Sequence, residues 1–282
     1  MKGGVSEVLD SAVVVDDVTV RELAGSREMT AASTLWDAIW FRADAGHEVD
    51  PALMVALSHA GGYLAAAYAG EDMIGAALGF WGVPAGGTLH SHITGVLPGH
   101  VGRGVGSALK QHQRAWVLAR GGSAITWTYD PLVSRNAYVN VRLGARPESY
   151  LPDLYGDLDD VLNRGDASDR LLVRWRLTEP APPRSTVEAV ELLIDVDGAP
   201  ATGTARADLD PATPVTVAVP DDITTLRRVA PTTASRWRTE VRDVLQPLLA
   251  DGWSITGFDR GTGYRVEPPR PEGGSPVNRT LS

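Results

Sequence analysis

Hydrophobic and polar residues alternate along the first 177 positions at two spacings, one typical of strands and one of helices. Short apolar runs or period-two alternation predict strands at residues 18–23, 61–68, 73–81, 88–97, 123–129 and 171–177. Apolar residues three and four apart predict helices at residues 26–42, 50–59, 104–120 and 134–143. Residues 69–72 (Ala-Gly-Glu-Asp) predict a hairpin turn between two of the strands. The predicted order is one strand, two helices, three strands, and then helices alternating with strands.

A proline-rich segment predicts a boundary in the chain. Residues 178–185 contain three prolines in eight positions, which is typical of a linker. Beyond it we predict strands at 187–196 and 215–219, a helix at 232–250, and a hairpin formed by 253–258 and 264–266. The expected organisation is therefore a flexible leader (1–17), a first domain (18–177), the linker, a smaller α+β domain (186–267) and a disordered tail (268–282).

Composition narrows the class of protein. The chain has 282 residues, 43% of them hydrophobic and 22% charged, which is typical of a soluble globular protein. No apolar run is long enough for a membrane span, and the first residues do not resemble a secretory signal, so we expect a cytoplasmic protein with no membrane partner. The absence of cysteine excludes disulfides, thiolate nucleophiles and cysteine metal sites. A net charge of −9 argues against a nucleic-acid partner.

The charge is unevenly distributed, because no Asp or Glu occurs between Met73 and Tyr129. The average acid content of the chain would place about seven there. The basic and histidine residues of this stretch are Arg103, Lys110, Arg114, Arg120, His90, His92, His100 and His112. Such a stretch favours a local anionic ligand, although a buried segment would also lack charge.

A glycine-rich segment runs from Gly95 to Leu109 and lies between a predicted strand and a predicted helix. Glycines allow successive backbone N–H groups to converge on an anion at a helix N-terminus. A nucleoside-triphosphate loop needs Lys and Ser or Thr directly after its last glycine, but Gly106 is followed by Ser107 and Ala108. The dinucleotide fingerprint also fails, because the glycines at 102, 104 and 106 are evenly spaced by two.

The segment Val101-Gly-Arg-Gly-Val-Gly106 resembles the pyrophosphate-binding motif of the GNAT superfamily of acyl-CoA N-acyltransferases. The order of predicted elements agrees over residues 18–177, and 127–145 with 149–156 resembles a subfamily with an extra C-terminal domain. The resemblance implies a mixed, mostly antiparallel central sheet flanked by helices, an α+β fold. It also implies acetyl-CoA or another short acyl-CoA as co-substrate, with no metal. The implied coenzyme-binding residues are Val96, Val101, Gly102, Arg103, Gly104, Val105, Gly106, Ser107 and Asn136.

The reaction implied by the resemblance is direct attack of an amine on the thioester, which needs a base and a hydrogen-bond donor for the oxyanion. A backbone N–H near Val96 is the expected donor. His90 and His92 share one face of their strand, and His92 is our candidate base, with a structural histidine as the alternative. A zinc site at this pair is disfavoured because no third ligand has a suitable spacing. Asp130 would either bind the substrate ammonium or cap the following helix.

Two positions depart from the family pattern. Val101 replaces the usual Gln or Arg, and Asn140 replaces the tyrosine that protonates the leaving thiolate in many relatives, while Tyr138 is turned away on the helix. The leading hypothesis is an N-acyltransferase that acts on the primary amine of a small metabolite. The alternatives are a catalytically silent acyl-CoA-binding sensor or interaction module, and a protein N-acetyltransferase. The second domain could cover the acceptor side, form a homodimer interface or stabilise the first domain.

Overall fold

The computed structural model describes residues 13–15, 17–40, 46–83, 87–156, 166–180, 187–208 and 210–269. The strands of the first sheet are β1 (Val13–Val15), β2 (Val18–Glu22), β3 (Tyr63–Ala69), β4 (Asp72–Trp81), β5 (Thr88–Val96), β6 (Ala124–Tyr129), β7 (Arg146–Leu151) and β8 (Arg170–Arg176). Those of the second are β9 (Val190–Val196), β10 (Ala199–Thr202), β11 (Val215–Val217), β12 (Ser254–Asp259) and β13 (Gly263–Glu267). The α-helices are α1 (Gly25–Trp40), α2 (Pro51–His59), α3 (Val105–Ala119), α4 (Ser134–Leu143), α5 (Ile223–Val229) and α6 (Pro231–Ala250), with short 3₁₀ turns at Pro98–His100 and Arg206–Asp208.

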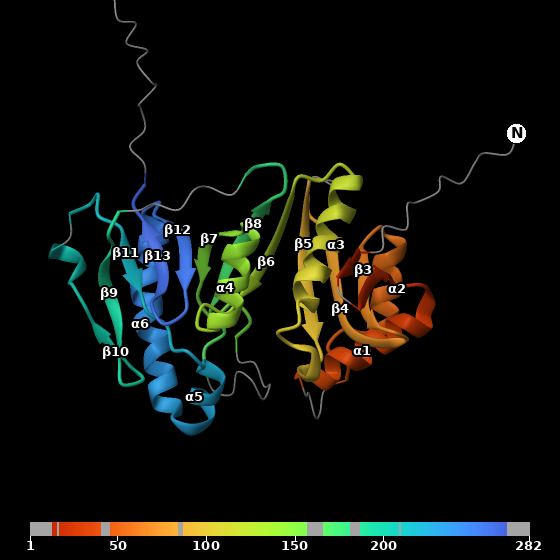
Figure 1. The fold of residues 1–282 in the computed structure, drawn as a ribbon, viewed down its shortest axis with the longest axis horizontal. Coiled ribbons are helices and arrows are strands. Elements are labelled where there is room, and N and C mark those ends of the chain that lie inside the picture. Colours follow the sequence, from red (N-terminus) through yellow and green to blue (C-terminus); the bar gives the residue numbers. More distant parts are fainter. Residues whose placement is uncertain are drawn as a thin grey trace, which may run out of the picture.

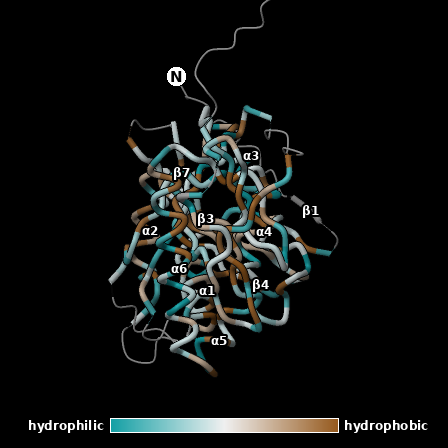
Figure 2. Tube along the Cα trace, turned by 90° about the vertical axis from the view of Figure 1, so that its left-hand side faces the viewer, coloured by the Kyte–Doolittle hydropathy of each residue, from teal (hydrophilic) through white to brown (hydrophobic). Residues whose placement is uncertain are grey.

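The first sheet has the order β1-β2-β3-β4-β5-β6-β8-β7, and every neighbouring pair is antiparallel except β5 and β6. Helices cover both faces, and β3 shows how: Leu64 and Ala66 pack with α1 and α2, whereas Ala65 and Ala67 belong to the core on the α3 side. Figure 2 shows the trace of these elements coloured by residue hydropathy. The mixed, mostly antiparallel α+β sheet agrees with the prediction.

The parallel strands β5 and β6 pair at one end and separate at the other. Their register runs from Thr88 opposite Ala124 to His90 opposite Thr126 and then stops, although both strands continue. Figure 1 shows them diverging. We call this opening the splay, with a closed end at His90 and an open end near Val96. Helix α3 begins beyond the open end, after the glycine-rich loop, and packs against β5.

A β-bulge lies on β5 beside the splay. On β4, Leu78 pairs with Ile93, but the next residue, Gly79, pairs with Ser91, so His92 has no partner in the ladder. A bulge interrupts the alternation of side chains between the two faces of a strand. Ser91 therefore lies on the α3 side, where it bonds Lys110, whereas Ile93 packs with the α1–α2 cluster. The extra residue presents His92 at the edge of the ladder.

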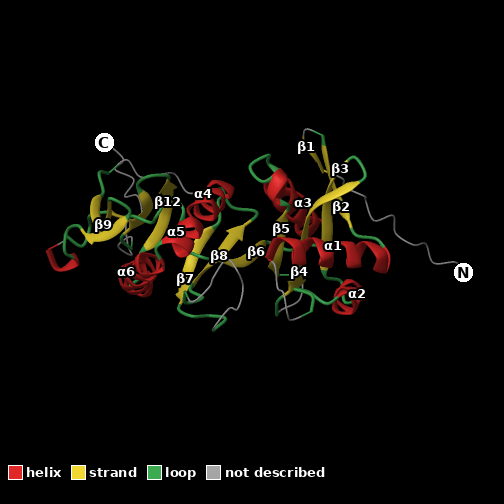
Figure 3. Ribbon diagram, turned by 90° about the horizontal axis from the view of Figure 1, so that it is seen from below, coloured by secondary structure: helices red, strands yellow, loops and turns green. Residues whose placement is uncertain are grey.

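The second sheet has the order β10-β9-β11-β13-β12 and adjoins the first, as Figures 1 and 3 show. Strand β12 contacts β7 and α4, and α6 contacts β7. A single cluster of buried residues extends from Val105 of α3 to Trp237 of α6 and Tyr264 of β13. The two sheets therefore share one apolar core. Most of the predicted linker (181–186) lies outside the described residues.

Most predicted elements are present, and their ends agree within a few residues. Asp50 caps α2 as expected, since its carboxylate accepts the N–H groups of Ala52 and Leu53. Three short strands, β1, β7 and β10, were not predicted, and β1 lies inside the predicted leader. Each is an outer strand of its sheet. These strands form because they pair with a neighbouring strand, since their sequences lack a regular alternation of apolar and polar residues. The rest of the leader except Asp17, and most of the tail (270–282), lie outside the described residues.

None of the helices in the described ranges combines the length and the apolar character that a membrane span requires.

Candidate active site

The glycine-rich loop turns sharply into α3. Gly102 and Gly104 have φ angles of +85° and +80°, a region that residues with a Cβ atom adopt reluctantly, and no atom lies within 4 Å of the position where their Cβ would be. The first hydrogen bond of the helix runs from the Ala108 N–H to the Gly104 carbonyl. Within the described residues, no acceptor is bonded to the backbone N–H groups of residues 102–107. Six donors and the positive end of the helix dipole are thus available to an anion.

The surroundings of the loop suit a phosphate group. The first turn of α3 contains no acidic residue, and Arg103 and Ser107 are exposed beside the free N–H groups. Val101 is 39% exposed, so its apolar side chain faces solvent and leaves the loop backbone accessible. Residues 102–107 therefore fit the pyrophosphate-binding role that the sequence predicted, through main-chain donors, whereas the N–H of Val101 is already bonded to the carbonyl of Pro98.

The wall of the splay presents a backbone donor from Val96. The N–H of the next residue, Leu97, is bonded to the carbonyl of Ile74 on β4. Successive N–H groups of an extended strand point to opposite edges, so the N–H of Val96 points away from β4 and toward the splay. The structure thus places the predicted oxyanion donor beside the opening.

His92 lies on the face of the sheet that α1 and α2 cover, with His90 and Phe80 beside it. The ring centroids of His90 and His92 are 6.4 Å apart, and that of Phe80 is 5.3 Å from the first and 5.8 Å from the second. Burial lowers the pKa of His92, while Glu48, between α1 and α2, partly opposes this. Burial and the neighbouring His92 and Lys110 also lower the pKa of His90. The surrounding atoms bury His92 only in part, and the residue keeps an exposed surface, so it is accessible to a substrate as a neutral base.

Residues 29–140 match the model of the Acetyltransferase (GNAT) family. The chain contains a GNAT acetyltransferase domain. Such a domain indicates an N-acetyltransferase. The matched residues include the glycine-rich loop, His92 and Asp130, and they end at Asn140.

Solved structures with a similar chain trace include GNAT proteins from several bacteria. A GNAT-family protein from Desulfovibrio desulfuricans is 18% identical, with a TM-score of 0.48 over 57% of this chain and 99% of its own. A Salmonella typhimurium protein solved with acetyl-CoA is 17% identical, with a TM-score of 0.47 over 60% of this chain and 99% of its own. A ribosomal-protein alanine N-acetyltransferase from Escherichia coli is 14% identical, with a TM-score of 0.46 over 58% of this chain and 96% of its own. No curated protein matches the chain significantly.

Asn140 occupies the position at which the family resemblance predicted a proton-donating tyrosine. Asn140 is buried, and its side-chain oxygen accepts a hydrogen bond from the Trp127 indole at 3.3 Å. Tyr138 is turned elsewhere, because its hydroxyl accepts a bond from Arg142 at 2.6 Å and its ring lies 4.8 Å from the Arg260 guanidinium. Neither residue is a proton donor in the splay.

The side chain of Asp130 is paired with arginines rather than free for either of the two roles that its position after β6 suggested, binding of a substrate ammonium or capping of the next helix. It is 7% exposed and is paired with Arg227 at 2.6 Å and with Arg238 at 2.8 Å, both from the second domain. Burial would raise its pKa, but the two guanidinium groups outweigh burial and hold the pKa well below its ordinary range. Its Oδ1 also accepts the N–H of Leu132, so it caps a turn before α4 rather than the helix itself. A carboxylate already held by two arginines is not available to a substrate ammonium.

Asn136 lies in the first turns of α4, where its side chain is exposed, so a coenzyme contact is sterically open to it. Sequence reasoning missed Glu48 and Phe80, which lie near His92. Phe80 could have been recognised, since it is a large apolar residue at an exposed position of a hairpin strand. Glu48 carried no such signal, because its position depends on how the segment between α1 and α2 folds.

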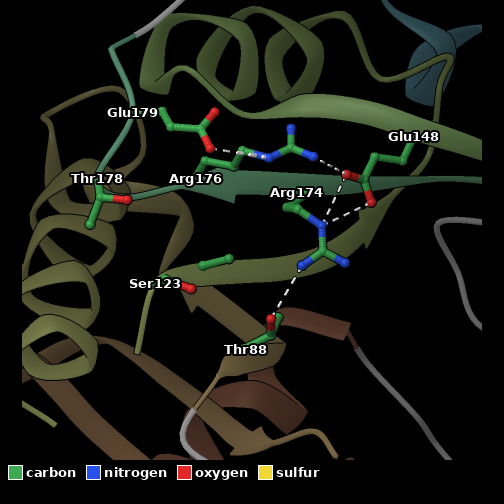
Figure 4. A pocket seen from close by; sticks show the side chains of 8 residues that line it. Thr88, Ser123, Glu148, Arg174, Arg176, Thr178 and Glu179 are labelled. Carbon is green, nitrogen blue, oxygen red and sulfur yellow. Dashed lines mark hydrogen bonds and ion pairs between the residues drawn. The ribbon is translucent and has the colours of Figure 1, made fainter. Parts of the chain in front are cut away.

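A surface pocket of about 440 Å³ lies at the closed end of β5 and β6, opposite the glycine-rich loop (Figure 4). Its arginines are already engaged. Arg174 Nε lies 2.9 Å from Glu148 Oε1, and its Nη1 lies 3.2 Å from the Thr88 hydroxyl. Arg176 Nη2 lies 3.3 Å from the same Glu148 oxygen. The lining residues are Thr88, Ser123, Ala124, Glu148, Arg174, Arg176, Thr178 and Glu179. Within the described part of the chain, no three metal-ligating side chains come together.

Proposed function

We propose that this chain is an acyl-CoA-dependent N-acyltransferase that uses acetyl-CoA and transfers its acyl group directly to the primary amine of a small metabolite. The observation that carries the proposal is the run of six unbonded N–H groups at the start of α3, beside two strands that separate. The GNAT match supports the reaction class, and a distant GNAT-like structure contains acetyl-CoA.

The loop would bind the coenzyme through its pyrophosphate. Residues 102–107 supply N–H groups without an acidic neighbour in the helix turn, and Arg103 adds a cation. Asn136 would add a contact from α4. Bound acetyl-CoA supplies a thioester carbonyl, which an amine can attack without a covalent enzyme intermediate.

His92 is the proposed base. It would take the proton of the substrate ammonium, so that the free amine attacks the carbonyl carbon, and a backbone N–H of β5 near Val96 would donate a hydrogen bond to the oxyanion. The bulge supports this role, because it projects His92 beside the splay. Phe80 and Glu48 each lie near His92, and an aromatic ring and a carboxylate around the base favour a cationic amine as acceptor.

Isothermal titration with CoA and acetyl-CoA tests the coenzyme site. We expect dissociation constants on the order of micromolar, which would justify a screen of small amines by thiol release. Absence of binding up to about millimolar concentrations would contradict the proposal. Binding without thiol release from any amine, peptide N-termini included, would favour a catalytically silent acyl-CoA-binding protein instead.

A further inference from the structure

Lys110 is a buried amine at the closed end of the splay. The last paired residues of β5 and β6 are His90 and Thr126, and Lys110 reaches from α3 to the residues that follow them. Its Nζ lies 2.8 Å from the Ser91 hydroxyl and 4.1 Å from the centre of the Trp127 ring. The Gln113 side-chain oxygen, at 3.3 Å, is its other acceptor. The residue is 8% exposed. The glycine-rich loop and Lys110 thus mark the two ends of one opening.

This amine has no counter-ion in the part of the chain that the structure describes. No carboxylate among the described residues forms an ion pair with it, and none affects its pKa, which burial alone lowers to about 7. The groups that face Lys110 are Ser91 from β5, Gln113 from α3 and Trp127 from β6. His90 is also near enough for the charge of Lys110 to lower the pKa of His90. His112 on the same helix bonds the Tyr63 hydroxyl instead. A buried ammonium normally has an anionic partner, so this arrangement is suited to an anion that arrives with a ligand.

We infer that the Lys110 ammonium receives the leaving thiolate of the coenzyme and stabilises it as an ion pair while CoA remains bound. The inference rests on the proposed function. When the amine nitrogen has attacked and the C–S bond breaks, the electron pair of that bond remains on sulfur as a thiolate. The Lys110 ammonium pairs with this charge and keeps its proton while CoA is bound. The sulfur takes a proton from solvent as CoA dissociates, so that free CoA is a thiol. Trp127, held by Asn140, positions the ammonium through its ring.

The ionisation of bound CoA tests this role without catalysis. At about pH 7.5 a free alkyl thiol is mostly protonated, so free CoA has little ultraviolet thiolate absorbance. With the unaltered protein we expect a clear thiolate signal from bound CoA and binding about tenfold tighter than that of S-methyl-CoA, which has no ionisable thiol. With Lys110→Met we expect loss of the signal and equal affinities for the two ligands. Gln111→Met, an exposed position on the same helix, should change neither.

The outcomes separate this inference from the proposed function. CoA binding without a thiolate signal in the unaltered protein would overturn the role of Lys110 and leave the coenzyme site intact. An unchanged signal in Lys110→Met would overturn it as well. Failure of the unaltered protein to bind CoA would overturn both. Thermal unfolding would reveal whether Lys110→Met folds. If it does not fold, the thiolate signal of the unaltered protein alone still tests the role of Lys110.

Discussion

The imidazole of His92 occupies a position that only the bulge of β5 creates. Replacement of His92 by Ala should lower kcat/KM by about 10² to 10⁴, the usual contribution of a general base. In the unaltered enzyme the rate should rise with pH through a value below 6.5, because burial lowers the pKa of His92 and the neutral ring is the base. A pH–rate profile of both proteins checks this. His90→Gln is the matched control on the same face, and loss of the same pH limb in that control would contradict the assignment.

Lys110 should reduce stability in a pH-dependent way. Its pKa is about 7 in the folded protein and higher in the unfolded chain, so the unfolded state binds more protons between these values. The free-energy cost of burying the Lys110 charge is therefore greatest below pH 7 and decreases as pH rises. Lys110→Met should be more stable than the unaltered protein by about 2–4 kcal/mol at low pH, and the advantage should shrink toward pH 10. Urea unfolding at several pH values measures it, and a pH-independent difference would contradict the prediction.

Single residues were the least predictable part of the site. His92 could be chosen from the sequence because its stretch lacks acids, but the bulge that exposes it depends on pairing with β4. Asp130 could not be interpreted, since its partners Arg227 and Arg238 lie about 100 positions later. One signal was available: Arg238 occupies the apolar stripe of α6 between Trp237 and Val241, a place where a charge needs a buried partner.

At the scale of elements, the loop that starts α3 carries the coenzyme proposal. Gly104→Val should weaken CoA binding at least about tenfold, because a β-branched side chain disfavours a φ of +80° and would crowd the free N–H groups. Isothermal titration measures the loss. Gly99→Ala is the control, because Gly99 has no positive φ and no atom lies near its Cβ position. Equal CoA affinity of Gly104→Val and the unaltered protein would show that the loop is not the phosphate site.

Elements with their own periodicity were predicted, and those that depend on a neighbour were not. Helix α3 has a buried stripe that includes Leu109, His112 and Trp116, which its spacing indicated. Strand β7 contains Pro147 and Glu148 and has no such pattern, and it is extended because it pairs with β8 and packs against α6. The separation of β5 and β6 likewise could not be predicted from the pattern of residues, and only the family motif indicated it.

At the scale of the whole molecule, a buried ion cluster joins the two domains. Arg238 and Arg227 bond Asp130 of the first domain and also Asp166, with all four side chains at most 8% exposed. Nearby, Arg242 bonds Asp169, which also accepts the Tyr150 hydroxyl at 2.6 Å. The cluster lies directly after β6, one wall of the splay. The second domain is thereby fixed to the strand that borders the proposed coenzyme site.

Removal of one arginine from this cluster should be costly. Arg238→Met should lower the free energy of unfolding by about 3–5 kcal/mol, because two carboxylates stay buried with one cation fewer. The low pKa of Asp130 stabilises the fold above the ordinary carboxyl pKa, and this contribution is lost as pH falls, so the difference should diminish below about pH 4. Denaturant unfolding measures both effects. Arg236→Met, 58% exposed on the same helix, should change stability by less than about 0.5 kcal/mol. An equal loss in both variants would contradict the role of the cluster.

The hydroxyl of Tyr264 donates a hydrogen bond of 2.7 Å to the carbonyl of Pro131, just past the end of β6. A strand that borders an opening lacks ladder partners along part of its length and would ordinarily fray there. Here the segment directly after β6 is tied to β13 of another sheet, so that fraying of this end must also break the bond of Tyr264. We therefore expect the amide protons at the end of β6 to exchange with solvent more slowly than those of an untied strand end.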